Sequence, residues 1–228
     1  APLVWGAVPT SIMVETGVPI TPLVLTSSGY VMPSTYFASE QPSWLLRPWD
    51  SFGETDFAVR FEGKPTTAGP ARLTLTPRGA PGPDITITFL VTDRPVITAP
   101  PTRTVLADTD VDIPVAVSGS PVSSVTATGL PTGLTVVAGV ALGAWHITGT
   151  VGRDTFGVYD VTLTADNGLV STHDLTLTVA GTPVLDDATV VTYLDQAAEA
   201  VVRSPGSPRP TPAVTARTPP PGPTAPAD

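Results

Sequence analysis

The sequence contains no cysteine, a single lysine (Lys64), a single asparagine (Asn167) and two histidines, and only 14% of its 228 residues are charged. Without cysteine, neither a disulfide framework nor a thiolate metal site can form, so packing must hold the fold together. The 20 acidic residues outnumber the 11 basic ones, and the net charge is −9. No basic surface is therefore available to neutralise phosphates, which argues against a nucleic-acid partner.

Long apolar runs are also missing. No segment approaches the roughly 18 apolar residues that a membrane span needs, and the first ten residues, APLVWGAVPT, lack the charged start and apolar stretch of a signal peptide. We expect no membrane partner. A signal already removed would leave the same start, so a secreted protein remains an open alternative.

Residues for catalysis are equally scarce. The chain has no Gly-x-Ser-x-Gly elbow and no thiol, and both histidines, His146 and His173, fall inside predicted strands, where we interpret them as solvent-facing. Nothing in the sequence assembles a nucleophile, a base and an oxyanion site. We predict a protein that is not an enzyme and needs no cofactor.

One acidic pattern raises the question of a calcium site, because Asp108, Asp110 and Asp112 alternate along the chain. Calcium takes six to eight oxygen ligands, usually from several loops. Alternating residues of a strand share one face but lie about 6.8 Å apart, so at most two of these carboxylates could reach one ion. We predict an acidic edge strand that resists aggregation, and no metal site.

What the sequence does contain is strand signal, from residue 1 to about 180. Apolar residues alternate with threonine or another polar residue at 71–76, 84–91, 159–165 and 173–179, the period of a strand with one buried face. Asp166, Asn167 and Gly168 separate the last two runs and suit a tight hairpin.

The strand-rich region repeats itself. Segments of matching character lie 86 to 93 residues apart: 15–20 with 108–113, 42–45 with 131–134, 61–63 with 147–149, and Gly69 with Gly157. Such a separation is that expected of two domains of one kind. Three prolines in 92–101 predict a short stiff linker between them.

These motifs resemble the bacterial immunoglobulin-like repeats related to cadherin-like dystroglycan domains. The second unit carries the resemblance through GLPTGLTV (129–136), ITGTVGRDTFGVYDVTLTADNG (147–168) and LTLTV (175–179), and the first through QPSWL, FEGKPTTAG and LTLT. The resemblance covers about four-fifths of the chain. It implies a β-sandwich fold and says little about activity, because sandwiches host unrelated functions.

The predicted fold is therefore all-β, with two tandem immunoglobulin-like sandwiches at 1–94 and 95–181. A short amphipathic helix follows at 182–204, where Val191, Leu194 and Val201 fall on one apolar stripe. Residues 205–228 form a predicted proline-rich extended tail. Too short to be stable alone, the helix needs a surface to pack against.

The leading functional hypothesis is a structural protein of a phage virion, a head decoration or accessory capsid or tail protein. Its partners would be the major capsid or another virion protein, or further copies of itself. Candidate contacts are Trp49 and Phe52 in the aromatic segment 44–52, and the stripe of the helix. Two alternatives remain: a secreted or cell-surface adhesion module of a high-GC bacterium, and a carbohydrate-binding module that takes a host-surface glycan.

Overall fold

The computed structural model describes residues 3–29, 36–52, 56–77, 81–153 and 155–181, and every regular element in this part of the chain is a β-strand. The predicted helix and proline-rich tail lie outside the described residues. The strands are β1 (Val4–Trp5), β2 (Ser11–Glu15), β3 (Leu23–Ser28), β4 (Tyr36–Glu40), β5 (Leu45–Phe52), β6 (Asp56–Gly63), β7 (Gly69–Pro77), β8 (Ile85–Thr98), β9 (Thr102–Leu106), β10 (Asp110–Ser120), β11 (Ser124–Thr128), β12 (Leu134–Ala138), β13 (Ala144–Thr150), β14 (Gly157–Asp166) and β15 (Val170–Ala180). Within the described residues, no helix has the length and hydropathy of a membrane span.

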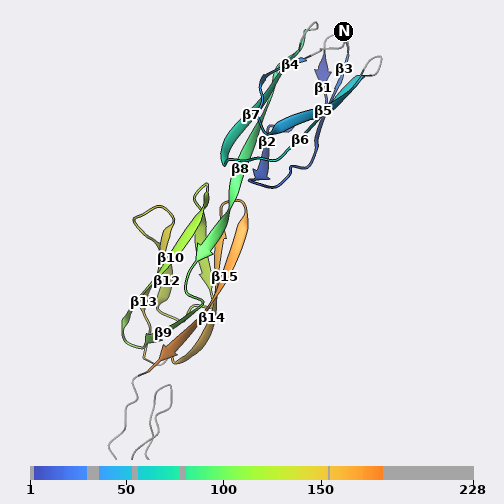
Figure 1. The fold of residues 1–228 in the computed structure, drawn as a ribbon. Helices are drawn as coiled ribbons and strands as arrows, with labels where there is room; N and C mark the ends of the chain where they lie inside the picture. Colours follow the sequence, from blue (N-terminus) through green and yellow to red (C-terminus); the bar gives the residue numbers. More distant parts are fainter. Residues whose placement is uncertain (1–2, 30–35, 53–55, 78–80, 154, 182–228) are drawn as a thin grey trace, which may run out of the picture.

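The strands form two sandwiches that lie end to end (Figure 1). In the first, the sheet β1-β3-β6-β5 faces a sheet that contains β4, β7, β8 and β2. In the second, the order β8-β10-β13-β12 faces β11-β14-β15-β9. Even the parallel pairing recurs, because β2 runs parallel to β8 and β9 runs parallel to β15. The two units therefore share one topology, strand for strand.

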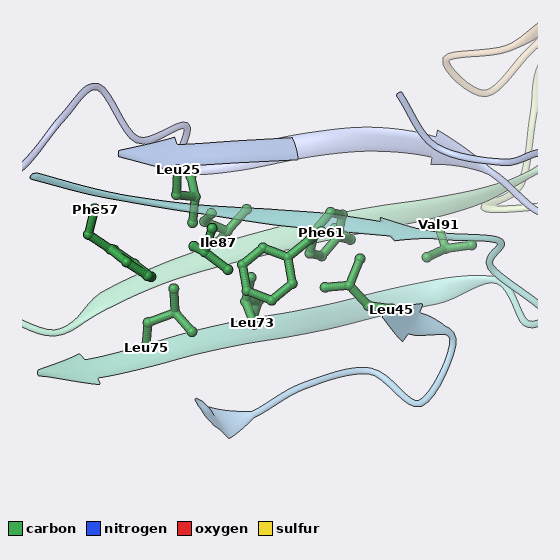
Figure 2. Packing of buried hydrophobic residues seen from close by; sticks show 10 residues of the cluster. Leu25, Leu45, Phe57, Phe61, Leu73, Leu75, Ile87 and Val91 are labelled. Carbon is green, nitrogen blue, oxygen red and sulfur yellow. The ribbon is translucent and has the colours of Figure 1, made fainter. Parts of the chain in front are cut away.

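Alternation along the strands builds two separate cores. In the first, Leu25, Phe61, Leu73 and Ile87 are fully buried between the sheets, and Figure 2 shows their side chains meeting there. Threonines occupy intervening positions such as Thr74 and Thr86. Burying each large apolar side chain contributes about 1.5–3 kcal/mol to folding. The second core is built in the same way from β10, β13, β14 and β15.

Strand β8 joins the two sandwiches without a break. Its first half pairs with β7 and β2, and its second half pairs with β10. At about 3.4 Å per residue, its 14 residues extend over about 48 Å. Residues 92–98 of the predicted linker are therefore part of a paired strand. The predicted boundary at 94/95 falls inside this strand, between Val91 of the first core and Ile97 at the second.

Proline is tolerated in this strand because of a local irregularity. The pairing of β8 with β10 shifts between Ser118 and Ser120, opposite Pro95. A proline has no N–H to donate, and such an irregularity removes the need for one. Gly119 stands at the shift with φ of +126°, and a Cβ there would lie 3.1 Å from the Cα of Pro95. The prolines of 92–101 indicated a linker because the pairing of β8 with β10 cannot be seen from the sequence.

The repeated turns confirm most of the predicted alignment. The N–H of Leu45 donates to the carbonyl of Pro42 at 3.0 Å, and that of Leu134 donates to Pro131 at 3.2 Å, so the two corners are equivalent. One block was misaligned, since Glu15 was matched with Asp108. The residue that corresponds to Asp108 is Gly17.

Gly17 and Asp108 have positive φ angles of 76° and 57°. Their N–H groups donate to the carbonyls of Pro65 and Val151, at 2.8 and 2.9 Å. The backbone conformation repeats here, and the chemical character of the side chains does not. For this reason, matching residues by character displaced the alignment by two positions.

Candidate functional site

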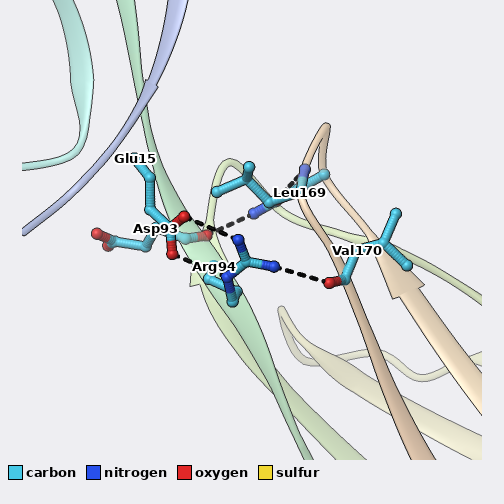
Figure 3. Close-up of polar contacts among 6 residues, drawn as sticks. Glu15, Asp93, Arg94, Leu169 and Val170 are labelled. Carbon is cyan, nitrogen blue, oxygen red and sulfur yellow. Dashed lines mark hydrogen bonds and ion pairs between the residues drawn. The ribbon is translucent and has the colours of Figure 1, made fainter. Parts of the chain in front are cut away.

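Two features of the described residues stand out: the junction between the sandwiches, and a groove on the first sandwich. At the junction, Arg94 in β8 reaches back to Glu15 at the end of β2 and forward to β15 (Figure 3). Its Nε and Nη2 donate to the two carboxylate oxygens of Glu15, both at 2.8 Å, and its Nη1 donates to the carbonyl of Val170 at 3.0 Å. One side chain thus binds both sandwiches.

At the junction, Glu15 and Arg94 each stabilise the charged form of the other. The hydrogen bonds from Arg94 lower the pKa of Glu15 below its ordinary value of 4.5, although burial acts in the opposite direction, and the same bonds raise the pKa of Arg94. A two-pronged guanidinium–carboxylate contact is both stronger and more directional than a single one. Because 50% of the Arg94 side chain is exposed, this pair orients the domains more than it stabilises them.

A second junction contact comes from the β14–β15 hairpin. The side-chain amide of Asn167 donates to the carbonyl of Asp93 at 2.8 Å and to that of Pro121 at 3.0 Å. Gly168, at the tip with φ of +99°, lies against Met13 of the first sandwich, and a Cβ there would overlap the methionine side chain. The hairpin itself was predicted. Its contact with the first sandwich was not, because a turn signal carries no information about neighbours.

The groove lies at the end of the first sandwich where β2 ends and β5 begins. Its lining combines apolar and charged side chains around a volume of about 610 Å³: Pro19, Ile20, Pro22, Ser43, Trp44, Leu46, Arg60, Glu62, Gly63 and Lys64. Trp44 is half-buried and meets Phe89 edge-on, with ring centroids 5.2 Å apart. Arg60 and Glu62 form an ion pair on the adjacent strand.

The described part of the chain does not test the contact residues predicted from the sequence. Trp49 and Phe52 lie in β5, the edge strand of its sheet, where their backbones pair with Arg60 and Phe57, and their side chains are not described. Val191, Leu194 and Val201 lie outside the described residues. As candidate contacts, all five remain predictions. The groove is lined instead by Trp44, the first residue of the same aromatic segment 44–52.

The three alternating aspartates of the second sandwich each contact a different side chain. Asp108 binds Arg153 at 2.7 Å, Asp110 accepts from Thr150 at 2.8 Å, and Asp112 contacts Nδ1 of His146 at 2.6 Å. Across the described ranges, no group of three or more His, Cys, Asp or Glu residues is placed to hold a metal ion.

The two histidines differ. His146 has a side chain that is 35% exposed, on the outer face of β13, as predicted. His173 lies on the same side of β15 as the buried Leu175 and Leu177, so the prediction of a solvent-facing position is wrong for this residue. Its Nε2 is buried and has no hydrogen-bond partner among the described residues. A polar residue near the end of a strand can thus lie on the face that packs into the core.

Solved structures of known proteins support the sandwich fold described above. No protein-family model matches the sequence, and no curated protein matches it. Among solved structures, the I-band fragment I67–I69 of titin is similar at 14% identity and a TM-score of 0.51, covering 80% of this chain and 67% of that one. An E-to-A variant of the same fragment matches at 14% identity and 0.51, covering 81% and 68%. The chain is therefore a tandem of immunoglobulin-like sandwiches.

At this identity, the likeness establishes the fold alone. An endo-fucoidan hydrolase of glycoside hydrolase family 107 is also similar, at 17% identity over 79% of this chain and 29% of that one, but its TM-score of 0.34 is too low to support an argument. Sandwiches of this kind host unrelated functions, so the fold does not specify what this chain does.

Proposed function

We propose that the chain is a non-enzymatic structural protein: a two-domain spacer with a set domain angle, which attaches to a larger assembly and presents the remainder of its surface outward. The observation that carries this proposal is the junction, where β8 passes unbroken from one sandwich to the next and Arg94 binds residues of both.

The junction matters because neighbouring domains ordinarily move relative to each other. Bending this pair requires more than rotation about a loop. It would break the contacts of Arg94 with Glu15 and Val170, and those of Asn167 with Asp93. A spacer that is already ordered loses less conformational entropy when its partner binds.

For the setting, we propose the surface of a phage particle, with the major capsid or another virion protein as partner. The acidic, cysteine-free composition and the proline-rich end of the chain support an accessory protein of this kind. The finer resemblance to cadherin-like dystroglycan-type repeats belongs to the same proposal. A cell-surface module of a high-GC bacterium would use the same spacer.

Two experiments test this proposal. Small-angle scattering of the purified chain should fit one extended domain arrangement, and a broad mixture of angles would contradict a fixed spacer. Immunogold labelling with an antiserum against the chain should then mark phage particles rather than host cells in an infected culture. Label on the cell wall alone would move the proposal to the cell surface.

The groove beside Trp44 favours a second candidate, a glycan-binding module. Sugars bind in sites that combine an aromatic ring with a few polar groups, and here Trp44 is accompanied by Arg60, Glu62 and Lys64. Retention on purified host cell-wall glycan should be lost in Trp44→Ala and Lys64→Ala and kept in Arg72→Ala, which removes an exposed cation outside the groove. Absence of retention by the wild type would eliminate this candidate.

A further inference from the structure

We infer that Asn167–Gly168 is a self-modifying site, at which the folded hairpin promotes loss of ammonia from Asn167 and formation of a succinimide. Asn167 is the only asparagine of the chain and is followed by glycine, which leaves the next backbone nitrogen open to approach. This inference does not depend on the proposed function.

The hairpin supplies a base for the attacking nitrogen. The N–H of Gly168 donates to Oδ1 of Asp166 at 2.7 Å. An amide nitrogen becomes a nucleophile only as it loses its proton, and a carboxylate held within hydrogen-bond reach of that proton is a candidate general base. Gly168 and Asp166 are both exposed, so water can reach the reacting groups.

The same turn polarises the group under attack. The N–H of Leu169 donates to Oδ1 of Asn167 at 3.2 Å. When the Gly168 nitrogen bonds to Cγ of Asn167, negative charge develops on this oxygen, and a donor already directed at it stabilises the intermediate. The base, the nucleophile and the oxyanion donor thus come from Asp166, Gly168 and Leu169, the residues that flank Asn167 in the hairpin.

The departing nitrogen also has partners. Nδ2 of Asn167 lies between the carbonyl oxygens of Asp93 and Pro121, at 2.8 and 3.0 Å. As the Cγ–Nδ2 bond breaks, the nitrogen keeps the bonding electron pair and takes up the proton that Asp166 removed from Gly168. Because both carbonyl oxygens accept hydrogen bonds from this nitrogen, they stabilise it as it gains a proton. The products are a succinimide and ammonia, and water then opens the ring to aspartate or isoaspartate.

Modification would weaken the junction. The new carboxylate has no hydrogen to donate to the carbonyls of Asp93 and Pro121, so both bonds are lost and the oxygen atoms repel one another. An isoaspartate also lengthens the backbone by one carbon at the tip of the hairpin. We expect aged protein to sample a wider range of domain angles.

The test compares deamidation of the full chain when folded and when unfolded in urea, at the same mildly alkaline pH and temperature. Peptide mapping by mass spectrometry in heavy-oxygen water would follow labelled aspartate and isoaspartate at position 167. The folded chain should react several-fold faster. An equal or slower rate in the folded chain would overturn the inference, because the fold would then protect the site.

Variants isolate the base. Asp166→Ser keeps a hydrogen-bond acceptor in the turn but removes the carboxylate, and it should abolish the advantage of the folded state. Asp160→Ser removes an exposed carboxylate from the same strand without touching the turn and should react like the wild type. Equal slowing in both variants, or in neither, would contradict the role of Asp166. The comparison of folded with unfolded wild type stands even if a variant fails to fold.

Discussion

Trp44 and Gly133 occupy the same position in the two sandwiches, one residue before the leucine whose N–H closes the corner onto a proline. Their carbonyls face the equivalent glycines Gly63 and Gly149. In the second sandwich a glycine with φ of +99° suffices here, whereas in the first an indole ring extends against the core and borders a groove. A shared backbone corner thus carries different side-chain chemistry in each repeat.

The close approach at these corners makes both glycines sensitive to substitution. A Cβ on Gly63 would overlap the carbonyl oxygen of Trp44, and one on Gly149 would overlap that of Gly133. We expect Gly63→Ala and Gly149→Ala each to lower the free energy of unfolding by about 1–3 kcal/mol, measured by urea denaturation. Gly152→Ala, which meets nothing within 4 Å, is the control and should change stability little. Equal effects in all three would show that contact is not the cause.

Trp44 contributes to the first core as well as to the groove. Trp44→Ala removes the edge-on contact with Phe89 and part of the apolar area that covers the core. Because the side chain is only half-buried, we expect a loss of about 2 kcal/mol in unfolding free energy, less than for a fully buried tryptophan. Leu46→Ala, at a position that is 62% exposed, should cost far less by the same measurement. A similar loss at both positions would contradict this account.

The Arg94 contacts predict a change of shape without a large change of stability. Arg94→Ala should widen the distribution of domain angles seen by small-angle scattering, because the side chain binds Glu15 and Val170 on opposite sides of the junction. Arg153→Ala disrupts an ion pair with Asp108 inside the second sandwich and should leave the angles unchanged. If Arg94→Ala scatters like the wild type, β8 and the contacts of the β14–β15 hairpin hold the domains in line without Arg94.

Acid should loosen the junction in the same way. The pKa of Glu15 is lowered in the folded protein. The ion pair with Arg94 therefore stabilises the junction fully above the ordinary pKa of 4.5, and this stabilisation is lost as the pH falls through the lower folded pKa. We expect the domain angles to broaden below about pH 4.5. Scattering or interdomain energy transfer would measure this broadening. In Glu15→Gln the acid-dependent step should be absent, and its persistence would assign the effect to another group.

Much of the fold was predictable from local patterns. Alternation at 71–76 and 173–179 correctly placed strands β7 and β15, and the recurrence of Pro42 and Pro131 identified equivalent corners. These features depend on residues close in the chain. Errors arose where a distant strand matters: Pro95 reads as a linker residue until the pairing with β10 is known.

The amino-acid sequence alone determines that this chain alternates strand faces, turns at repeated positions and forms two like units without disulfides. It does not reveal the junction, because Arg94 and Glu15 are 79 residues apart and Asn167 and Asp93 are 74 apart. Local preferences report which face a residue occupies and where a turn forms. Contacts across the junction depend on how the two packed sandwiches meet, and that geometry exists only in the folded chain.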